Sequence, residues 1–419
     1  MNARNTLINH VRVLDPVTKS DRTANVHIVE GKISQISSQP IEVPPDTETL
    51  NGTGLILAPG LVDLYSQSGE PGYEDRETLT SLANAALSGG YTRLTLLPNT
   101  NPPLDNPASL SLLQQKSPQT PQISLWVGLT QHLKGEQMTE LAELATSGIV
   151  GFADGYPLNN WSLLRRVLEY SQPFGKPVGF VPYHPALAEG GVMREGSFSI
   201  QAGLPGNPAF SETTALASLL ELLPTFPTPV HIMRVSTARS VELIADGKAR
   251  GLPITASTTW LHLLLDTQAI SSYNPNLRLN PPLGNPRDKE ALREGVKAGV
   301  IDAVAVDHTP YTYEEKTVAF GEAPPGAIGL ELALPLLWQH LVATGDWTAL
   351  ELWQALSVGP QWCLQQQPLQ CAVGENAELV LFNPQQRWEV NTQTLQSKSA
   401  NTSWLGQEIR GKVVKVISN

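Results

Sequence analysis

The pattern that most constrains this chain is a regular alternation, from residue 55 onwards, between short apolar runs and amphipathic segments. Eight apolar runs, most of them as long as one buried strand, lie at residues 55–65, 92–98, 123–129, 148–154, 177–181, 230–235, 253–259 and 301–307. Segments with helical spacing lie between them, at 76–88, 138–146, 161–170, 211–222, 238–250 and 287–298. Strand and helix alternating eight times over about 250 residues predicts an α/β fold, an eight-stranded parallel β/α barrel of the TIM type.

Shorter strands with a two-residue period flank the barrel region on both sides. Those before it are separated by turn signals such as Asp15-Pro16, and they lie at 7–13, 24–29 and 32–36. Two further helical segments and two late strands follow the barrel, at 329–342, 347–357, 378–382 and 412–417. We expect the strands of both termini to pack together as one small composite β-sandwich domain. The chain then divides into an N-terminal part of that domain, the barrel and a C-terminal part, at residues 1–56, 57–360 and 361–419.

The charge balance argues against nucleic acid and anionic membranes as partners. The chain carries 28 Lys and Arg against 39 Asp and Glu, a net charge of −11, and it has no basic run. No stretch approaches 18 consecutive apolar residues, and the first ten residues lack the apolar core of a secretory signal, so a soluble protein is expected. Its two cysteines, Cys363 and Cys371, are too few for a disulfide framework and indicate a cytoplasmic location.

Polar residues at the C-terminal ends of the predicted strands define the candidate site, because that end of such barrels carries the chemistry. On the first strand, Asp63, Tyr65 and Gln67 are two residues apart and therefore share one face. The other strand ends supply Asn99, Thr130, Asp154, Val181, Arg234, Ser257, Thr259, Asp307 and His308. This ring is polar, but it does not contain the cluster of His and carboxylate ligands that a metal site requires.

Several short motifs occur in order along the chain. They are Pro59-Gly60-Leu61-Val62-Asp63, Glu70-Pro71-Gly72, Pro98-Asn99-Thr100-Asn101-Pro102-Pro103, Leu187-Ala188-Glu189-Gly190-Gly191-Val192-Met193, Val235-Ser236-Thr237, Asn280-Pro281-Pro282-Leu283, Val306-Asp307-His308-Thr309-Pro310, Glu314-Glu315-Lys316, Ile328-Gly329-Leu330-Glu331 and Ser397-Lys398-Ser399. With them the chain resembles the dihydroorotase family of the amidohydrolase superfamily over nearly its full length. The resemblance implies a metal-dependent cyclic-amide hydrolase that interconverts carbamoyl-aspartate and dihydroorotate in pyrimidine synthesis.

The departures from the family pattern fall on its chemistry. The resemblance implies histidine ligands at the positions where this chain has Tyr65, Gln67, Val181 and Arg234. It also implies an arginine that grips the substrate carboxylate, and Gly69 stands there instead. The family residues that remain are Asp307 at the catalytic position, Asp154 at a metal-ligand position, and three at substrate-binding positions, Asn99, Asn280 and His308.

Donor chemistry predicts that the zinc site of the family is lost. A catalytic zinc ion needs three or more N, O or S ligands, whereas Gln67 is a weak donor and Val181 is none. Arg234 carries a permanent charge that repels a cation. Without a metal, making hydroxide at neutral pH costs roughly 12 kcal/mol more, and Asp307 alone does not offset that. We therefore expect no metal and no other cofactor, and we expect Arg234 to form an ion pair with Asp154 or Asp307 in the place of the metal.

Other polar residues have structural interpretations beside the functional ones. Asn99 and Asn280 lie in Asn-Pro turns, where an asparagine also serves local backbone hydrogen bonds. His184 and His262 lie near strand ends but not at matched ligand positions. His231, three residues before the sixth strand's end, is expected on the opposite strand face, packed against helices. Three hydroxyl residues have no base placed beside them by any motif and are interpreted as satisfied polar groups: Ser236, Ser257 and Thr259.

The leading functional interpretation is a dihydroorotase-like protein that has lost catalysis. The resemblance implies a role as a non-catalytic partner of aspartate carbamoyltransferase, with which metal-site-deficient family members associate in some bacteria, and a homo-oligomeric state. One alternative is an active cyclic-amide hydrolase with a rearranged site. The other is a metal-free protein that binds a carboxylated pyrimidine precursor through Asn99 and His308.

Overall fold

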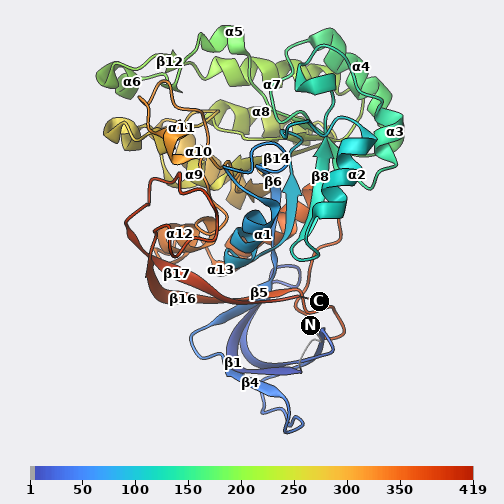
Figure 1. Ribbon diagram of the computed structural model, residues 1–419, viewed down its shortest axis with the longest axis vertical. Coiled ribbons are helices and arrows are strands. Elements are labelled where there is room, and N and C mark those ends of the chain that lie inside the picture. Colours follow the sequence, from blue (N-terminus) through green and yellow to red (C-terminus); the bar gives the residue numbers. More distant parts are fainter. Residues whose placement is uncertain (1–4, 419) are drawn as a thin grey trace.

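Eight parallel strands form the central sheet of the computed structural model, which describes residues 5–418 (Figure 1). In sheet order they are β6 (Leu61–Ser66), β7 (Tyr91–Leu96), β8 (Gln122–Val127), β9 (Gly151–Phe152), β10 (Val178–Phe180), β13 (Val230–Ile232), β14 (Ile254–Thr259) and β15 (Ala303–Ala305). The two edges meet, because the Gln67 N–H donates to the His308 carbonyl at 2.8 Å and the Val306 N–H donates to the Asp63 carboxylate at 2.7 Å. The predicted TIM-type barrel is confirmed.

Most of the helices that cover the barrel follow the segments with helical spacing. They are α1 (Leu79–Ser88), α2 (Pro107–Lys116), α3 (Leu141–Ala145), α4 (Trp161–Ser171), α7 (Phe210–Leu222), α8 (Ala238–Ala249) and α10 (Pro286–Lys297). The sequence did not predict α2, whose Ser and Gln residues give a weak apolar stripe; its start is fixed by the Asn106 side chain, which accepts the Ser109 N–H. Shorter helices lie on the loops, at α5 (Pro185–Ala188), α6 (Ser197–Ala202), α9 (Trp260–Leu264) and α11 (Tyr313–Lys316).

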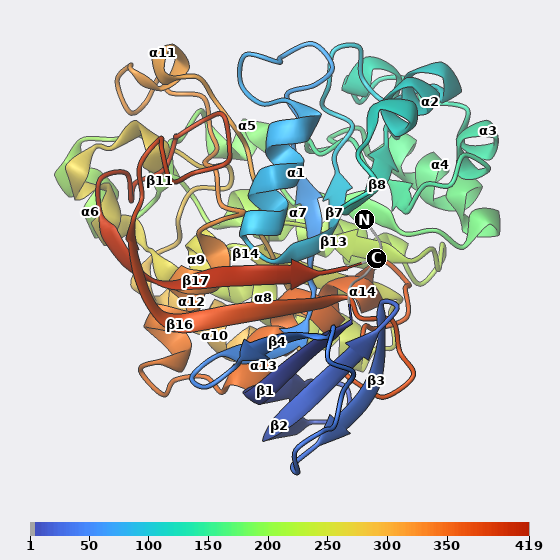
Figure 2. The same cartoon turned by 60° about the horizontal axis from the view of Figure 1, so that its bottom comes forward.

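A second sheet combines strands from both ends of the chain, as predicted (Figure 2). Its order is β17 (Glu408–Ile417), β16 (Leu379–Glu389), β5 (Ile56–Pro59), β1 (Thr6–Asp15), β2 (Ser20–Val29) and β3 (Lys32–Ser37), with β4 (Glu48–Asn51) also paired to β1. The two halves join where β16 runs antiparallel to β5. Apolar residues from both halves, among them Ile8, Val26, Leu57 and Leu381, form one buried cluster. The numerical division of the chain into three parts stays a prediction.

The apolar character of residues 55–65 predicts one strand, but the structure has two strands there. β5 belongs to the second sheet and β6 to the barrel, and the chain turns between them at Gly60. The carbonyls at the turn are held by the late helices: Trp353 Nε1 donates to Pro59 O at 3.1 Å and Ser357 Oγ donates to Gly60 O at 2.7 Å. A Cβ on residue 60 would lie 2.1 Å from Thr92 Oγ1, so only glycine fits this turn.

The late helical segments contain two π-helical turns. The first segment is α12 (Ala333–Leu337) followed by the π-helix Trp338–Val342, and the second is α13 (Ala349–Trp353), the π-helix Gln354–Val358 and α14 (Gly359–Cys363). Where these helices meet β16, Trp338 packs edge to face against both Trp353 and Phe382. Within residues 5–418, every helix is too short or too polar to cross a membrane.

Candidate functional site

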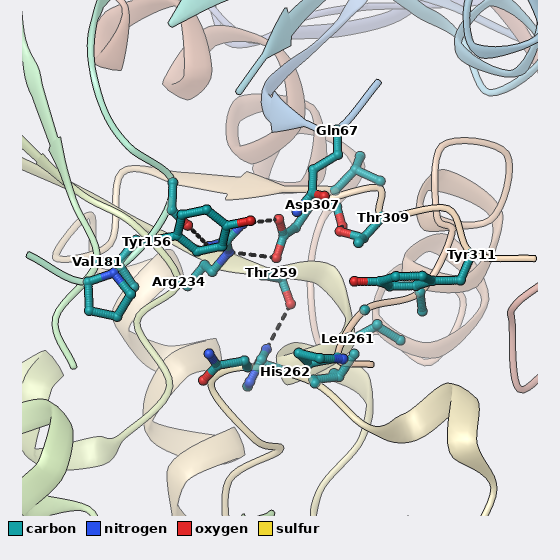
Figure 3. Close-up of a pocket in the computed structure, with 18 residues that line it drawn as sticks. Gln67, Tyr156, Val181, Arg234, Thr259, Leu261, His262, Asp307, Thr309 and Tyr311 are labelled. Atoms are coloured by element: carbon teal, nitrogen blue, oxygen red, sulfur yellow. Dashed lines mark hydrogen bonds and ion pairs between the residues drawn. The ribbon is translucent and has the colours of Figure 1, made fainter. Parts of the chain in front are cut away.

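A cavity of about 100 Å³ opens at the C-terminal ends of the barrel strands (Figure 3). Seven of the residues singled out from the sequence line it: Gln67, Val181, Arg234, Thr259, His262, Asn280 and Asp307. The remaining wall comes mainly from loops that the sequence did not single out, and it includes Tyr156, Leu261 and Tyr311. The only sequence signal for these residues is their position a few residues after a strand end, which many loop residues share.

A bidentate ion pair between Arg234 and Asp307 lies in this cavity. Arg234 Nε donates to Asp307 Oδ2 and Nη2 donates to Oδ1, each at 2.7 Å, and Nη1 donates to the Gly155 carbonyl at 2.9 Å. Figure 3 shows the guanidinium and the carboxylate facing each other. The Arg234 side chain is 8% exposed and that of Asp307 is 18% exposed. Burial acts to lower the pKa of Arg234, but the charge and hydrogen bonds of Asp307 outweigh it, so the pKa is raised above its ordinary value and the guanidinium stays charged.

Both partners of the ion pair have a left-handed backbone. The φ angle is 57° at Arg234 and 53° at Asp307, a conformation that side chains other than glycine rarely adopt. Tyr65 helps to hold it, because its hydroxyl accepts the Arg234 N–H at 3.0 Å and its ring centroid lies 5.5 Å from the guanidinium carbon. Tyr65 is fully buried beneath the cavity. Residues 65 and 234, both at expected histidine positions, therefore support each other in this chain.

Tyr65 continues into a line of polar groups inside the barrel. Its hydroxyl lies 2.9 Å from Ser257 Oγ, which lies 2.9 Å from His231 Nε2, and His231 Nδ1 lies 2.9 Å from Thr255 Oγ1. The prediction that His231 packs against helices is wrong, because its ring stacks on Trp126 in the barrel interior. Alternation fails here because β13 ends at Ile232 and the chain then turns into the left-handed conformation at Arg234. Burial lowers the pKa of His231 to about 3, which keeps it neutral.

Asp154 does not take part in the ion pair. Its carboxylate accepts the Thr130 N–H at 3.0 Å and the Thr130 hydroxyl at 2.6 Å. Burial raises its pKa to about 6, with the Thr130 hydrogen bonds acting in the opposite direction. The sequence left Asp154 and Asp307 open as partners of Arg234, and the structure pairs Arg234 with Asp307. Asn99 donates to the Asp154 carbonyl at 3.1 Å and does not line the cavity.

The histidines near the site are also engaged by protein groups. His308 is buried outside the cavity lining, with Nε2 3.4 Å from Glu77 Oε2 and Nδ1 accepting the Gly329 N–H at 3.2 Å. His262 does line the cavity, but Nδ1 lies 2.8 Å from Thr259 Oγ1 and Nε2 lies 3.3 Å from the Pro282 carbonyl. Burial lowers the pKa of His262 to about 4. Asn280 is therefore the one predicted substrate-binding residue that reaches the cavity, whereas Asn99 and His308 lie outside it.

Comparison with known proteins identifies the family. A family model described as dihydro-orotase-like matches residues 54–222. A probable dihydroorotase-like protein of Synechocystis sp. is 46% identical, and the match covers 96% of this chain and 97% of that protein. This chain belongs to the dihydroorotase family. Dihydroorotases of Syntrophus aciditrophicus and Geobacter metallireducens are 34% and 35% identical, with 98% and 97% of this chain and 97% and 96% of those proteins covered.

Solved structures extend the likeness of this dihydroorotase-family chain to the hydantoinases. The L-hydantoinase of Arthrobacter aurescens superimposes with a TM-score of 0.85 at 19% identity, over 100% of this chain and 97% of that one. A D-hydantoinase from Thermus sp. gives a TM-score of 0.79 at 22% identity, over 97% and 93%. At these identities the likeness concerns the fold, which is the barrel with the added sheet.

The donor set of this dihydroorotase-family site does not fit the zinc that the family implies. Both carboxylate oxygens of Asp307 accept hydrogen bonds from Arg234, and Val181 offers no donor atom. The guanidinium fixes a positive charge in the cavity, where a dication would be repelled. Within residues 5–418, no three His, Cys, Asp or Glu side chains are grouped so that they could hold a metal ion.

Proposed function

We propose that this dihydroorotase-family protein does not hydrolyse or close cyclic amides and acts as a non-catalytic, homo-oligomeric partner of aspartate carbamoyltransferase. The observation that carries the first part is the Arg234–Asp307 ion pair in the cavity. It occupies both oxygens of the one carboxylate that faces the cavity among the candidate residues. It also puts a fixed cation at an expected metal-ligand position.

The acid–base groups around the cavity support the loss of hydrolysis. A general base near neutral pH needs a free acceptor within reach of the substrate. Asp307 accepts from Arg234, Asp154 faces Thr130 and not the cavity, and both nitrogens of His262 are within hydrogen-bond distance of protein oxygens. The pKa of His262, lowered to about 4 by burial, places it far from the pH at which a histidine base is most effective.

One purified sample tests the catalytic part of the proposal. We expect metal well below one equivalent per chain, and no dihydroorotate or carbamoyl-aspartate turnover above that of the Asp307→Ala variant, with and without added Zn²⁺. Stoichiometric bound metal together with turnover that Asp307→Ala abolishes would contradict the proposal. That result would favour the alternative of an active cyclic-amide hydrolase with a rearranged site.

The partner proposal rests on the resemblance to metal-site-deficient family members and is tested separately. We expect the protein to co-elute with aspartate carbamoyltransferase of the same organism during size-exclusion chromatography at physiological salt. An active dihydroorotase with intact histidine ligands, mixed with the same transferase, is the matched control for the role of the lost site. Separate elution of the two proteins at micromolar concentration would count against the scaffold role.

A second candidate function, the binding of a small molecule without a metal, is favoured by the cavity itself. Asn280, Gln67, Thr309 and Tyr311 line it beside the ion pair and offer amide and hydroxyl groups to a polar ligand. Isothermal titration with dihydroorotate and with carbamoyl-aspartate at millimolar concentration tests it. The absence of heat with both compounds would rule out this candidate for the two ligands.

A further inference from the structure

A second cavity, of about 340 Å³, lies at the opposite end of the barrel. Ile301 and Asp302, which immediately precede β15, line this cavity, whereas Val306 and Asp307, which follow β15, line the first one. Its other walls come from the end of α10, from α13 and the π-helix after it, and from the turn between β1 and β2. Figure 2 shows α10 and α13 beside the N-terminal strands, and α13 packs against β1.

The walls of this second cavity are mainly apolar and include two indoles. Trp347 and Ile301 are 3% and 1% exposed and form fixed, buried surfaces. Leu350 and Ala355 add aliphatic surface beside them. Trp362, by contrast, is 55% exposed, so much of its indole surface is open to solvent at this cavity. A concave site of this size with aromatic walls has the dimensions of a small-molecule site and is too small to admit a folded partner.

One cation at this cavity is free to meet an anion, although the chain as a whole is acidic. Of the two acids in the wall, Asp302 is paired with a cation, because both of its oxygens accept from Lys248 Nζ, at 2.7 and 2.8 Å. Glu351 accepts the N–H and hydroxyl of Thr348 with one oxygen, Oε2. Of the two lysines, Lys19 has no side-chain partner within residues 5–418, and Lys297 lies 3.4 Å from Glu294 in an exposed pair. The unpaired cation is therefore that of Lys19.

We propose that this second cavity binds a small aromatic anion, with its ring against Trp362 and Trp347 and its acid group toward Lys19. The binding does not involve the Arg234–Asp307 cavity and does not depend on the proposed function. Lys19 is presented by the turn between β1 and β2, where its own φ angle is 55°. The site is therefore built jointly by the barrel and the terminal sheet, a junction of the kind where ligand sites are common.

The probe that tests this proposal is 1-anilino-8-naphthalenesulfonate, whose fluorescence rises in apolar sites. N-phenyl-1-naphthylamine has the same rings without the sulfonate and is the neutral control. Three variants are compared: Lys19→Asn, because asparagine tolerates the left-handed φ of the turn; Trp362→Ala, at a half-exposed position; and Lys134→Asn, an exposed lysine far from the cavity lining. Far-ultraviolet circular dichroism confirms that each variant is folded.

We expect the sulfonate to bind one site per chain. Lys19→Asn should weaken the sulfonate about threefold or more without affecting the neutral probe, since a charge-assisted contact is lost. Trp362→Ala should weaken both probes, and Lys134→Asn neither. Equal weakening of both probes by Lys19→Asn would overturn the assignment of the anion to Lys19. Sulfonate binding that is absent, or unaffected by Lys19→Asn and Trp362→Ala, would overturn the site.

Discussion

Replacing Arg234 by Met tests how much the ion pair contributes to the fold. The change removes three hydrogen bonds from guanidinium nitrogens, two to Asp307 and one to the Gly155 carbonyl. Methionine is preferred to smaller residues because its flexible unbranched side chain fills much of the same space. It also carries a Cβ as arginine does, so the strain of the left-handed backbone at φ 57° is unchanged.

The expected cost follows from the burial of the charge left behind. Removing one partner of a buried ion pair costs about 3–5 kcal/mol, because the remaining charge has lost its compensation. Since the Asp307 side chain is 18% exposed, water reaches it in part, and we expect the lower end, about 3 kcal/mol. Arg239 pairs with Glu242 on the surface with 61% of its side chain exposed, so Arg239→Met should change stability by less than about 1 kcal/mol.

Urea unfolding of four proteins measures the effect: the wild type, Arg234→Met, Asp307→Asn and the double variant. In the double variant no uncompensated charge is buried, so its loss should be at least about 2 kcal/mol smaller than the sum of the two single losses. Comparable slopes against urea in all four would show that the unfolding reaction is the same. If Arg234→Met costs no more than Arg239→Met, or if the losses are additive, the ion pair does not hold the strand ends together.

Two further predictions concern groups near this pair. Tyr65→Phe removes the buried hydroxyl that accepts the Arg234 N–H and should cost about 1–3 kcal/mol of stability. The control is Tyr91→Phe, which should cost little, because the buried Tyr91 hydroxyl has no hydrogen-bond partner in the described chain. Equal losses of the two variants in thermal or urea unfolding would refute the reasoning. Burial raises the pKa of Glu331 from 4.5 to about 7, so its contribution to stability is fully present below pH 4.5 and is lost as the pH rises through about 7. Glu331→Gln should therefore gain up to about 3 kcal/mol relative to the wild type between pH 5 and pH 8, and parallel stability curves would contradict this.

The barrel and its composite sheet were predictable because they depend on periodicities that tertiary contacts do not change. Each of the eight apolar runs supplied one strand of the barrel, and the strands of the two termini joined as expected. The break at Gly60 was not predictable, because the run on both sides of it is equally apolar. What divides that run is the anchoring of the carbonyls of Pro59 and Gly60 by Trp353 and Ser357, almost 300 residues later in the chain.

The site was predictable in its composition but only in part in its geometry. The sequence placed Arg234 near two carboxylates, but the choice of Asp307 depends on Thr130, which satisfies Asp154 through both its N–H and its hydroxyl. A threonine at a strand end gives no signal of that role. The orientation of His231 was predicted wrongly, because the prediction counted alternating faces back from Arg234. Arg234 has a left-handed backbone, so strict alternation does not hold between the two residues.

The place of β16 in the second sheet fixes when this protein can finish folding. β16 lies between β17 and β5. One side of β5 pairs with β1, and its other side pairs only with β16. A ribosome makes residues 379–389 only after the whole barrel segment, so the edge of β5 stays open throughout most of synthesis. An open strand edge is a template for pairing with other chains. Once made, β16 covers that edge, so it removes a site for wrong pairing as well as completing the sheet.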